Sequence, residues 1–287
     1  MNDASKVLLA KNESGDLAAA DAARALASAA GEAGRLAFSM FRTDVRTWKK
    51  EFDSPVTEAD IAVDALLRER LHAVAPAYGW QSEESEDVRV SHRRRWVVDP
   101  IDGTRSFIKG LADWCIAIAL VEDGRPIAAA VHAPATDELF VAVAGGGATR
   151  NGVPIAVSKT KSLAAARLAG PRSALDELLR GGRHFEVVPR IHSLALRFAR
   201  VAAGEIDAAL ASERSRDWDL AAADLLVHEA GGALTTAPGV RLVYDRPEAE
   251  HPPLVAAGPA MHRALVAVLG DISGAQGSSQ TTKAVKR

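Results

Sequence analysis

The chain has 287 residues, which is enough for one large α/β domain or for two closely joined halves. Hydrophobic residues make up 48% of the chain and charged residues 25%, which indicates a globular protein rather than a disordered or membrane-spanning one. The formal net charge is -2, and this balance argues against a broad surface for nucleic acids or membranes.

The sequence also bears on the compartment. Cys115 is the only cysteine and lies in an apolar run, so an intramolecular disulfide is excluded and a reducing cytoplasm is expected. The first residues lack the pattern of a secretory signal, in which a basic segment precedes an apolar one. No apolar stretch is long and charge-free enough to span a bilayer. We therefore expect a cytoplasmic protein without a membrane partner.

The first half of the chain predicts two helices followed by strands. Alanine and leucine at helical spacing predict an amphipathic helix over residues 16–42. A polar loop over 47–54 precedes a second helix that contains residues 61–71. A polar stretch over 81–95 leads to a short apolar strand at 96–98, and the arginines at its end are expected in a solvated loop. An antiparallel meander is predicted from three further strands, at residues 114–122, 126–131 and 138–144.

The second half mixes helices and strands, without an evident repeat. The expected helices lie at residues 173–180, 193–203 and 220–230, and the expected strands at 185–188 and 206–211. The composition of the last residues predicts disorder. The expected organisation is a flexible N-terminus over 1–15, an N-terminal half over 16–160, a C-terminal half over 161–269 and a disordered tail over 270–287.

Two carboxylates, Asp99 and Asp102, directly follow the predicted strand at 96–98. A tight turn can hold both on one side, where they suit Mg2+, because this hard cation prefers oxygen ligands. Alternatively, one aspartate caps the following helix and the other forms a turn. The next residues, Gly103 and Thr104, can open a short helix whose free N–H groups would receive a phosphate.

Other acidic residues have simple structural explanations when each is taken alone. Glu83 lies in an acidic stretch of the kind that is usually a solvated loop. Thr57 and Asp60 have the spacing of a helix capping box. Asp217 and Asp219 precede a helix, where either acid could complement the helix dipole. The chain lacks an HExxH motif, a GxSxG elbow and a Walker-type glycine loop, which argues against zinc sites, acyl-serine hydrolysis and nucleotide-triphosphate hydrolysis.

Four segments, taken together in their order and spacing, resemble the inositol monophosphatase superfamily. They are Val56-Thr57-Glu58-Ala59-Asp60, Ser82-Glu83-Glu84, Trp96-Val97-Val98-Asp99-Pro100-Ile101-Asp102-Gly103-Thr104 and Trp218-Asp219-Leu220-Ala221-Ala222. The resemblance extends from about the first helix to Leu269. It implies an α/β (α+β) fold of the layered αβαβα sandwich type and a lithium-sensitive, Mg2+-dependent phosphatase with two to three metal ions in its active site.

The resemblance also implies metal ligands. Glu83, Asp99 and the Ile101 carbonyl would bind the first metal ion. Asp99, Asp102 and Asp219 would bind the second, and a third, weaker ion would rely on Glu83 and water.

Catalytic and substrate-binding roles follow from the same motifs. Asp60 and Thr104 would orient or deprotonate the attacking water, with Glu83 as the third catalytic residue. The amides of Gly103 and Thr104 would hold the phosphate. Further substrate contacts are expected from Arg105, Ser106, Glu213 and Arg214.

The substrate remains open among several candidates. Ser82 stands where the family commonly has glycine, and the segment Arg105-Ser106-Phe107-Ile108-Lys109 looks more like that of bisphosphate nucleotidases or histidinol-phosphate phosphatases. Arg214 and Arg216 could bind a second phosphate through paired hydrogen bonds, or they could be merely solvated. The leading hypothesis is a 3'(2'),5'-bisphosphate nucleotidase, which converts 3'-phosphoadenosine 5'-phosphate to AMP and phosphate. Inositol monophosphate and then histidinol phosphate follow.

A hypothesis of a different class is an RNA- or transcription-complex-binding protein on the same fold. Every expected metal carboxylate is present in the sequence, which favours the enzyme. A homodimer is an expectation that comes from the family alone.

Overall fold

The computed structural model describes residues 16–50, 54–90, 93–246 and 250–270. The N-terminal segment at 1–15 and the tail from residue 271, for which flexibility and disorder were predicted, lie outside these ranges. Residue 270 itself, where the predicted tail begins, lies in a helix. None of the helices in the described ranges is both long and apolar enough to cross a membrane.

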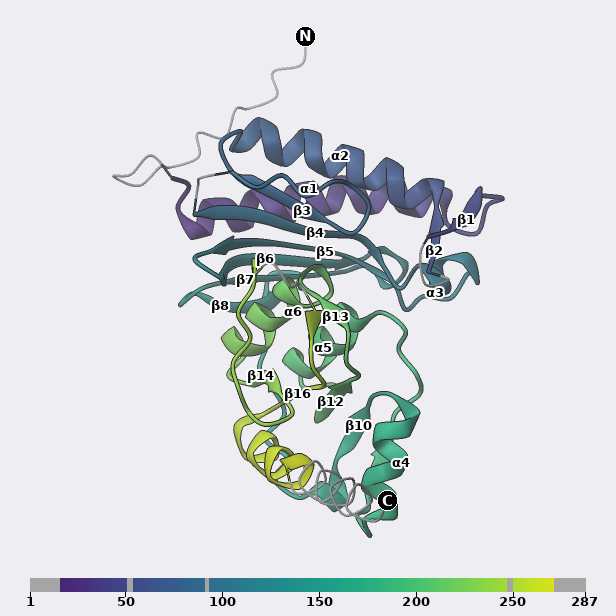
Figure 1. Ribbon diagram of the computed structural model, residues 1–287, viewed down its shortest axis with the longest axis vertical. Coiled ribbons are helices and arrows are strands. Elements are labelled where there is room, and N and C mark those ends of the chain that lie inside the picture. Colours follow the sequence, from purple (N-terminus) through teal and green to yellow (C-terminus); the bar gives the residue numbers. More distant parts are fainter. Residues whose placement is uncertain (1–15, 51–53, 91–92, 247–249, 271–287) are drawn as a thin grey trace, which may run out of the picture.

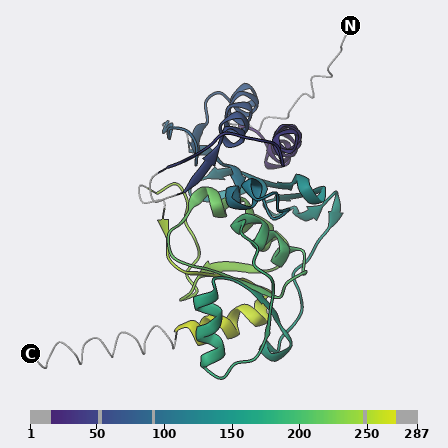
Figure 2. The same ribbon diagram turned by 90° about the vertical axis from the view of Figure 1, so that its right-hand side faces the viewer.

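Helices and sheets alternate in five layers (Figures 1 and 2). The helices are α1 (Ala19–Met40), α2 (Glu58–Val74), α3 (Thr104–Ile108), α4 (Arg172–Arg180), α5 (Leu194–Ala202), α6 (Asp217–Glu229) and a helix over residues 259–270. Helices α1 and α2 cover one face of a seven-stranded sheet, and α5 and α6 lie between this sheet and a five-stranded one. The far face of the second sheet carries α4 and the helix over 259–270. This arrangement confirms the predicted αβαβα sandwich.

The seven-stranded sheet has the order β3-β4-β5-β6-β7-β8-β9. Its strands are β3 (Gly79–Ser82), β4 (Arg94–Asp102), β5 (Cys115–Glu122), β6 (Arg125–Ala133), β7 (Glu138–Val143), β8 (Gly147–Arg150) and β9 (Val153–Pro154). Strand β3 pairs in parallel with β4, and the remaining neighbours pair antiparallel, which confirms the predicted meander. Strand β4 is buried along its whole length and ends at the acidic residues.

The five-stranded sheet has the order β11-β10-β12-β16-β14. Its strands are β10 (Arg167–Ala169), β11 (Glu186–Val187), β12 (Ala208–Ala211), β14 (Ala233–Thr236) and β16 (Leu254–Ala257). Two small pairs complete the fold, β1 (Thr47–Lys49) with β2 (Pro55–Thr57) and β13 (Ser215–Arg216) with β15 (Glu250–His251). The loop predicted over 47–54 was therefore wrong at its start, because β1 pairs with β2 across the entry to α2.

Small side chains explain how closely α1 approaches the sheet. Its buried face is mostly alanine, and Gly34 lies so close to β6 that an added Cβ would be 2.2 Å from Nδ1 of His132. The same His132 nitrogen contacts the Ala30 carbonyl oxygen at 2.9 Å, which fixes the helix on the strand. The alanine-rich composition thus serves close packing as well as helix propensity.

Of the three arginines expected in a solvated loop, Arg93 is exposed, whereas Arg94 and Arg95 are buried in β4. Arg94 donates from Nε to Glu122 at 2.9 Å and from Nη1 to the Tyr78 hydroxyl at 3.0 Å. Arg95 donates to the Trp80 carbonyl at 3.1 Å and pairs with the Asp245 carboxylate. Partners from distant segments make this burial possible, because a buried charge needs hydrogen-bonded counter-groups.

The core between the two sheets draws on both predicted halves of the chain. It includes side chains of β5 and β6 as well as α5 and α6. The division of the chain near residue 160 stays a prediction, but this shared core shows that the two sheets are packed as one structure.

Candidate active site

The ends of β4 and α6 bring three carboxylates together. Asp99 and Asp102 end β4, Asp219 lies in the first turn of α6, and one oxygen from each lies within 4.8 Å of the others. Residues three apart on a regular strand face opposite sides of a sheet. The pairing of β4 with β5 shifts register between Asp99 and Asp102, and this irregularity allows both side chains to reach the same side.

The cluster has the electrostatics of a cation site. Both carboxylate oxygens of Asp99 are buried without a hydrogen-bond partner in the part of the chain that the structure describes. Burial, followed by the charges of Glu83 and Asp102, raises the pKa of Asp99 well above its ordinary range. Burial and the neighbouring Asp102 do the same to the pKa of Asp219. Buried carboxylates without partners and a donor set made of oxygen fit a hard divalent cation such as Mg2+.

Asp102 is oriented by the start of α5. Ser193 donates its hydroxyl to Asp102 Oδ2 at 2.6 Å, and the Ala195 N–H donates to the same oxygen at 2.6 Å. Ser193 is also the N-cap of α5, because its hydroxyl accepts the Leu196 N–H at 3.0 Å. Ser193 was not among the predicted site residues, although a serine directly before an apolar helix is a recognisable N-cap signal.

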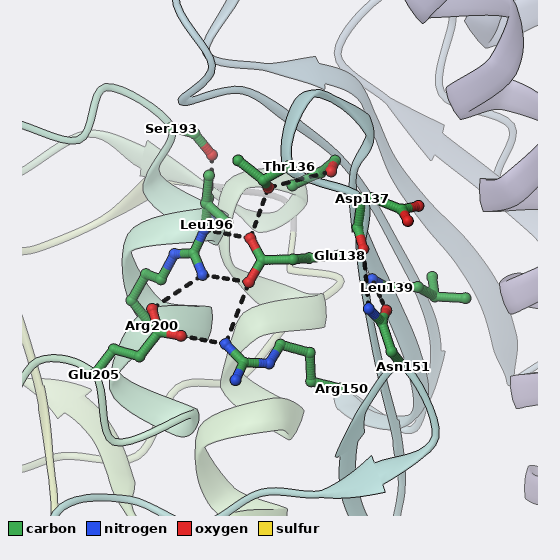
Figure 3. A network of polar contacts seen from close by, with 11 residues as sticks. Thr136, Asp137, Glu138, Leu139, Arg150, Asn151, Ser193, Leu196, Arg200 and Glu205 are labelled. Carbon is green, nitrogen blue, oxygen red and sulfur yellow. Dashed lines mark hydrogen bonds and ion pairs between the residues drawn. The ribbon is translucent and has the colours of Figure 1, made fainter.

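A network of ion pairs fixes α5 on the seven-stranded sheet (Figure 3). Glu138 on β7 accepts from Arg200 of α5 at 2.6 Å and from Arg150 of β8 at 3.2 Å. Arg200 also donates to Glu205 at 3.0 Å. Burial opposes ionisation of Glu138, but the hydrogen bonds from Arg200 and Thr136 outweigh it and lower the pKa of Glu138. The helix that orients Asp102 is therefore held by ionised partners.

Glu83 follows β3 and approaches the cluster from the sheet edge. Lys50 donates to the Glu83 carbonyl at 3.2 Å, lies 3.7 Å from the Glu83 carboxylate and pairs with Glu84. Burial raises the pKa of Glu83 against the effect of Lys50, and burial raises the pKa of Glu84 to about 7. Lys50 was not predicted, since nothing in the polar segment around it points to a partner 33 residues away.

Asp60 and Thr104 form a hydrogen-bonded pair beside the cluster. Asp60 completes the capping box of α2, in which Oδ2 accepts from the Thr57 N–H at 2.8 Å and from its hydroxyl at 2.5 Å. Its other oxygen lies 3.2 Å from the Thr104 hydroxyl, which is also 3.0 Å from the Ile101 carbonyl oxygen. Burial raises the pKa of Asp60. Asp60 thus both caps α2 and contacts Thr104, as predicted.

Gly103 allows the chain to turn from β4 into α3. Its φ of 95° is left-handed, and an added Cβ would lie 2.9 Å from the Asp113 carbonyl oxygen. The turn opens onto a cavity of about 230 Å³. This cavity is lined by Ser54, Pro55, Glu83, Asp99, Ile101, Asp102, Gly103, Thr104, Arg105, Arg190, His192 and Asp219.

We call this cavity of about 230 Å³ the metal cavity. Two larger cavities adjoin it. One of about 710 Å³ shares Arg190 and His192 with it and extends toward α4 and β12; we call it the distal cavity. The other, of about 580 Å³, shares Ser54, Glu83 and Asp219 and is bordered by Lys50 and β13. The acidic cluster is therefore open on two sides to space large enough for a small molecule.

The predicted substrate contacts are only partly brought together. Arg105 is exposed and lines the metal cavity, whereas Ser106 is buried and contacts His192. Arg214 lines the 580 Å³ cavity. Glu213 is exposed in the turn after β12 and does not line any of the three cavities. His192 was not among the predicted site residues, because its partners Ser106 and Asp113 lie far away in the chain.

Comparison with known proteins agrees with this geometry. A model of the inositol monophosphatase family matches residues 17–272, which is most of the chain. The chain belongs to the inositol monophosphatase family. Members of this family are metal-dependent hydrolases of phosphate monoesters, and this member is such a phosphatase.

Relatives within the family carry different names. The inositol-1-monophosphatase of Rhizobium meliloti (strain 1021) is 37% identical over 197 residues, which cover 64% of this chain and 73% of that protein. The histidinol-phosphatase of Mycobacterium tuberculosis is 37% identical over 229 residues, 76% of this chain and 87% of that protein. The crystal structure of the extragenic suppressor protein suhB from Bartonella henselae has a TM-score of 0.78 at 28% identity, covering 86% of this chain and 97% of that one. These names leave the substrate open.

Proposed function

We propose that the protein hydrolyses a small phosphate monoester with Mg2+, held in two to three sites by Glu83, Asp99, Asp102, Asp219 and the Ile101 carbonyl. The observation that carries this proposal is the buried Asp99 carboxylate, which has no hydrogen-bond partner in the described chain and lies among other acids. When bound, Mg2+ neutralises phosphate charge, lowers the pKa of the attacking water and stabilises the leaving oxygen.

The residues around the cluster supply the remaining functions. Asp60 holds the Thr104 hydroxyl at 3.2 Å, and this pair orients the attacking water and accepts its proton. The N–H groups of Gly103 and Thr104, at the opening of α3, hold the phosphate that is transferred. Arg105 at the rim of the metal cavity adds positive charge for an incoming anion.

For the substrate we propose a 3'(2'),5'-bisphosphate nucleotide. Exposed Arg190 and Arg105 line the metal cavity, and Arg214 lines the neighbouring one, so a second phosphate has cationic partners near the first. The same positive charge disfavours histidinol phosphate, whose leaving group carries an amine. Inositol monophosphate, which is neutral apart from its phosphate, ranks between the two.

The proposal is tested by phosphate release from 3'-phosphoadenosine 5'-phosphate, inositol 1-phosphate and histidinol phosphate. Each is assayed with Mg2+, with EDTA, and with Mg2+ plus Li+. We expect release that requires Mg2+, is inhibited by Li+ and is fastest with the bisphosphate. Asp102→Asn should abolish turnover while the protein stays folded. Asp123→Asn, an exposed acid far from the cluster, is the matched control and should retain full activity.

Failure has a defined form. If Mg2+ binds but none of the three esters is hydrolysed, the proposed ranking of substrates is refuted and the binding hypothesis gains weight. If the Asp102→Asn protein keeps a cellular role in RNA or transcription complexes, the binding hypothesis replaces the enzymatic one. The homodimer and the cytoplasmic location stay predictions.

A further inference from the structure

His192 lies between the two cavities and is held from one side only. It directly precedes the N-cap Ser193 of α5. Its backbone N–H donates to Asp113 Oδ2 at 2.7 Å, and its ring nitrogen Nδ1 lies 2.8 Å from the same oxygen. The Ser106 hydroxyl, from α3, lies 3.0 Å from Nδ1. Three contacts thus fix the position of the imidazole.

These contacts determine which ring nitrogen carries the proton. Burial opposes ionisation of Asp113, but hydrogen bonds from the His192 N–H and from Ser106 outweigh it and lower the pKa of Asp113. An ionised carboxylate can only accept hydrogen bonds, so Nδ1 must carry a hydrogen. In the neutral imidazole, Nε2 is then an acceptor.

The arrangement differs from a nucleophilic serine triad. In such a triad the serine and the aspartate contact opposite nitrogens of the histidine. Here Ser106 and Asp113 both contact Nδ1, so the imidazole is not placed to take a proton from Ser106 through Nε2. Within the described ranges, Nε2 has no hydrogen-bond partner, which leaves it available to a ligand.

The position of His192 indicates what that ligand group is. His192 lines both the metal cavity and the distal cavity. With the scissile phosphate at the acidic cluster, a leaving alcohol that enters the distal cavity must pass His192, because His192 lines both cavities. The part of the alcohol nearest to this boundary is the carbon that bears the ester oxygen, together with its direct neighbours.

We propose that His192 is a specificity-determining residue whose Nε2 accepts a hydrogen bond from a hydroxyl on the carbon next to the phosphate ester. The substrate class is phosphate monoesters of vicinal diols, which includes ribonucleoside 3'-phosphates and inositol phosphates. This inference rests on the proposed function. An ester without that hydroxyl leaves a partly buried acceptor unpaired, and a site built for a hydroxyl discriminates against such an analogue.

The test compares substrates that differ at this hydroxyl. The first pair is 3'-phosphoadenosine 5'-phosphate and its 2'-deoxy analogue, and the second is 2-hydroxycyclohexyl phosphate and cyclohexyl phosphate. We expect the wild-type protein to favour the hydroxyl-bearing member of the nucleotide pair by about tenfold in kcat/KM, as expected for one hydrogen bond.

Two variants separate recognition from anchoring. His192→Asn places an amide where Nδ1 lay, so it keeps the bond to Asp113 but removes Nε2. It should reduce the preference to less than about twofold, with an unchanged melting temperature. His192→Gln reaches the place of Nε2 but gives up the anchor, and should retain part of the preference.

The possible outcomes are distinct. A wild-type protein without preference, or a His192→Asn protein that keeps it, overturns the inference while the phosphatase proposal stands. If no ester is hydrolysed, the proposed function fails, and calorimetry with the same nucleotide pair in Mg2+ decides the inference. In that case the inference is supported if the wild-type protein binds the hydroxyl-bearing nucleotide more tightly and the His192→Asn protein does not. Equal affinities of the wild type for the two nucleotides overturn the inference.

Discussion

Replacing Asp99 by asparagine should stabilise the metal-free protein and at the same time remove its stabilisation by Mg2+. The amide has nearly the shape of the carboxylate, so the packing at the end of β4 is kept while one charge is lost. In the metal-free protein this charge is buried and faces Asp102 and Asp219. In the Mg2+-bound protein, the proposed function makes it a ligand.

The size of the stabilisation expected for Asp99→Asn follows from the separation of the carboxylates. At the 4.8 Å limit between carboxylate oxygens, two full negative charges repel by about 3.5 kcal/mol at an effective dielectric constant of about 20. Partial protonation of the metal-free cluster relieves part of this repulsion. We therefore expect Asp99→Asn to gain about 1–2 kcal/mol at neutral pH, which corresponds to a rise of about 2–8 °C in the melting temperature.

The stability of the metal-free protein should depend on pH in a definite direction. The pKa of Asp99 is raised in the folded protein above its ordinary value of 3.8, so the folded state binds a proton more tightly than the unfolded chain does. The metal-free wild type therefore loses stability as the pH rises from about 4 toward the raised pKa. Stabilisation by Mg2+ should increase with pH instead, because the cation competes with protons for the same oxygens.

Thermal unfolding in EDTA and in saturating Mg2+, at about pH 5 and about pH 8, measures both effects. Asp123→Asn removes an exposed charge outside the site and controls for the change in net charge. A variant that melts below the wild type in EDTA, or that gains as much from Mg2+ as the wild type does, would refute the view that Asp99 is a buried ligand.

Three further substitutions test the surroundings of the cluster. Thr104→Val removes the hydroxyl beside Asp60, so kcat should fall about 100-fold or more, while the Mg2+ affinity measured by calorimetry should stay the same. An unchanged kcat would exclude the Asp60–Thr104 pair from catalysis. Ser193→Ala removes a hydrogen-bond donor to Asp102 and the cap of α5. It should lower the free energy of unfolding in urea by about 1–2 kcal/mol and the Mg2+ affinity by about tenfold or more. A variant with wild-type Mg2+ affinity would contradict the orienting role of Ser193. Gly103→Ala places a side chain on a left-handed backbone and against the Asp113 carbonyl oxygen, so it should lower the free energy of unfolding by about 2 kcal/mol or more. A variant with the urea midpoint of the wild type would speak against this strain.

Features with a local physical cause could be predicted from the sequence. The carboxylates of Asp99 and Asp102 follow an apolar strand, and the spacing of Thr57 and Asp60 is that of a helix cap. The layered fold followed from the family resemblance of these motifs. What the pattern did not contain was the register shift that lets Asp99 and Asp102 share one side of the sheet.

Features that depend on distant partners could not be predicted. Asp113 and His192 are 79 residues apart, and no periodicity relates them. Arg95 looked solvated because its partner Asp245 follows 150 residues later. Strand β3 was missed because it is only four residues long, and its partner β4 is what makes it a strand.

The two cavities are built by different parts of the chain. The acids come from β3, β4 and the start of α6, whereas the distal cavity is walled mainly by the segments after β10, before α5 and after β12. With the leaving alcohol in the distal cavity, as proposed, substitutions in those three connecting segments should change which alcohol is accepted while the hydrolytic chemistry persists. A lineage built in this way can diversify its substrates by altering loops alone, which gives a physical reason why relatives with one reaction bear the names of several metabolites.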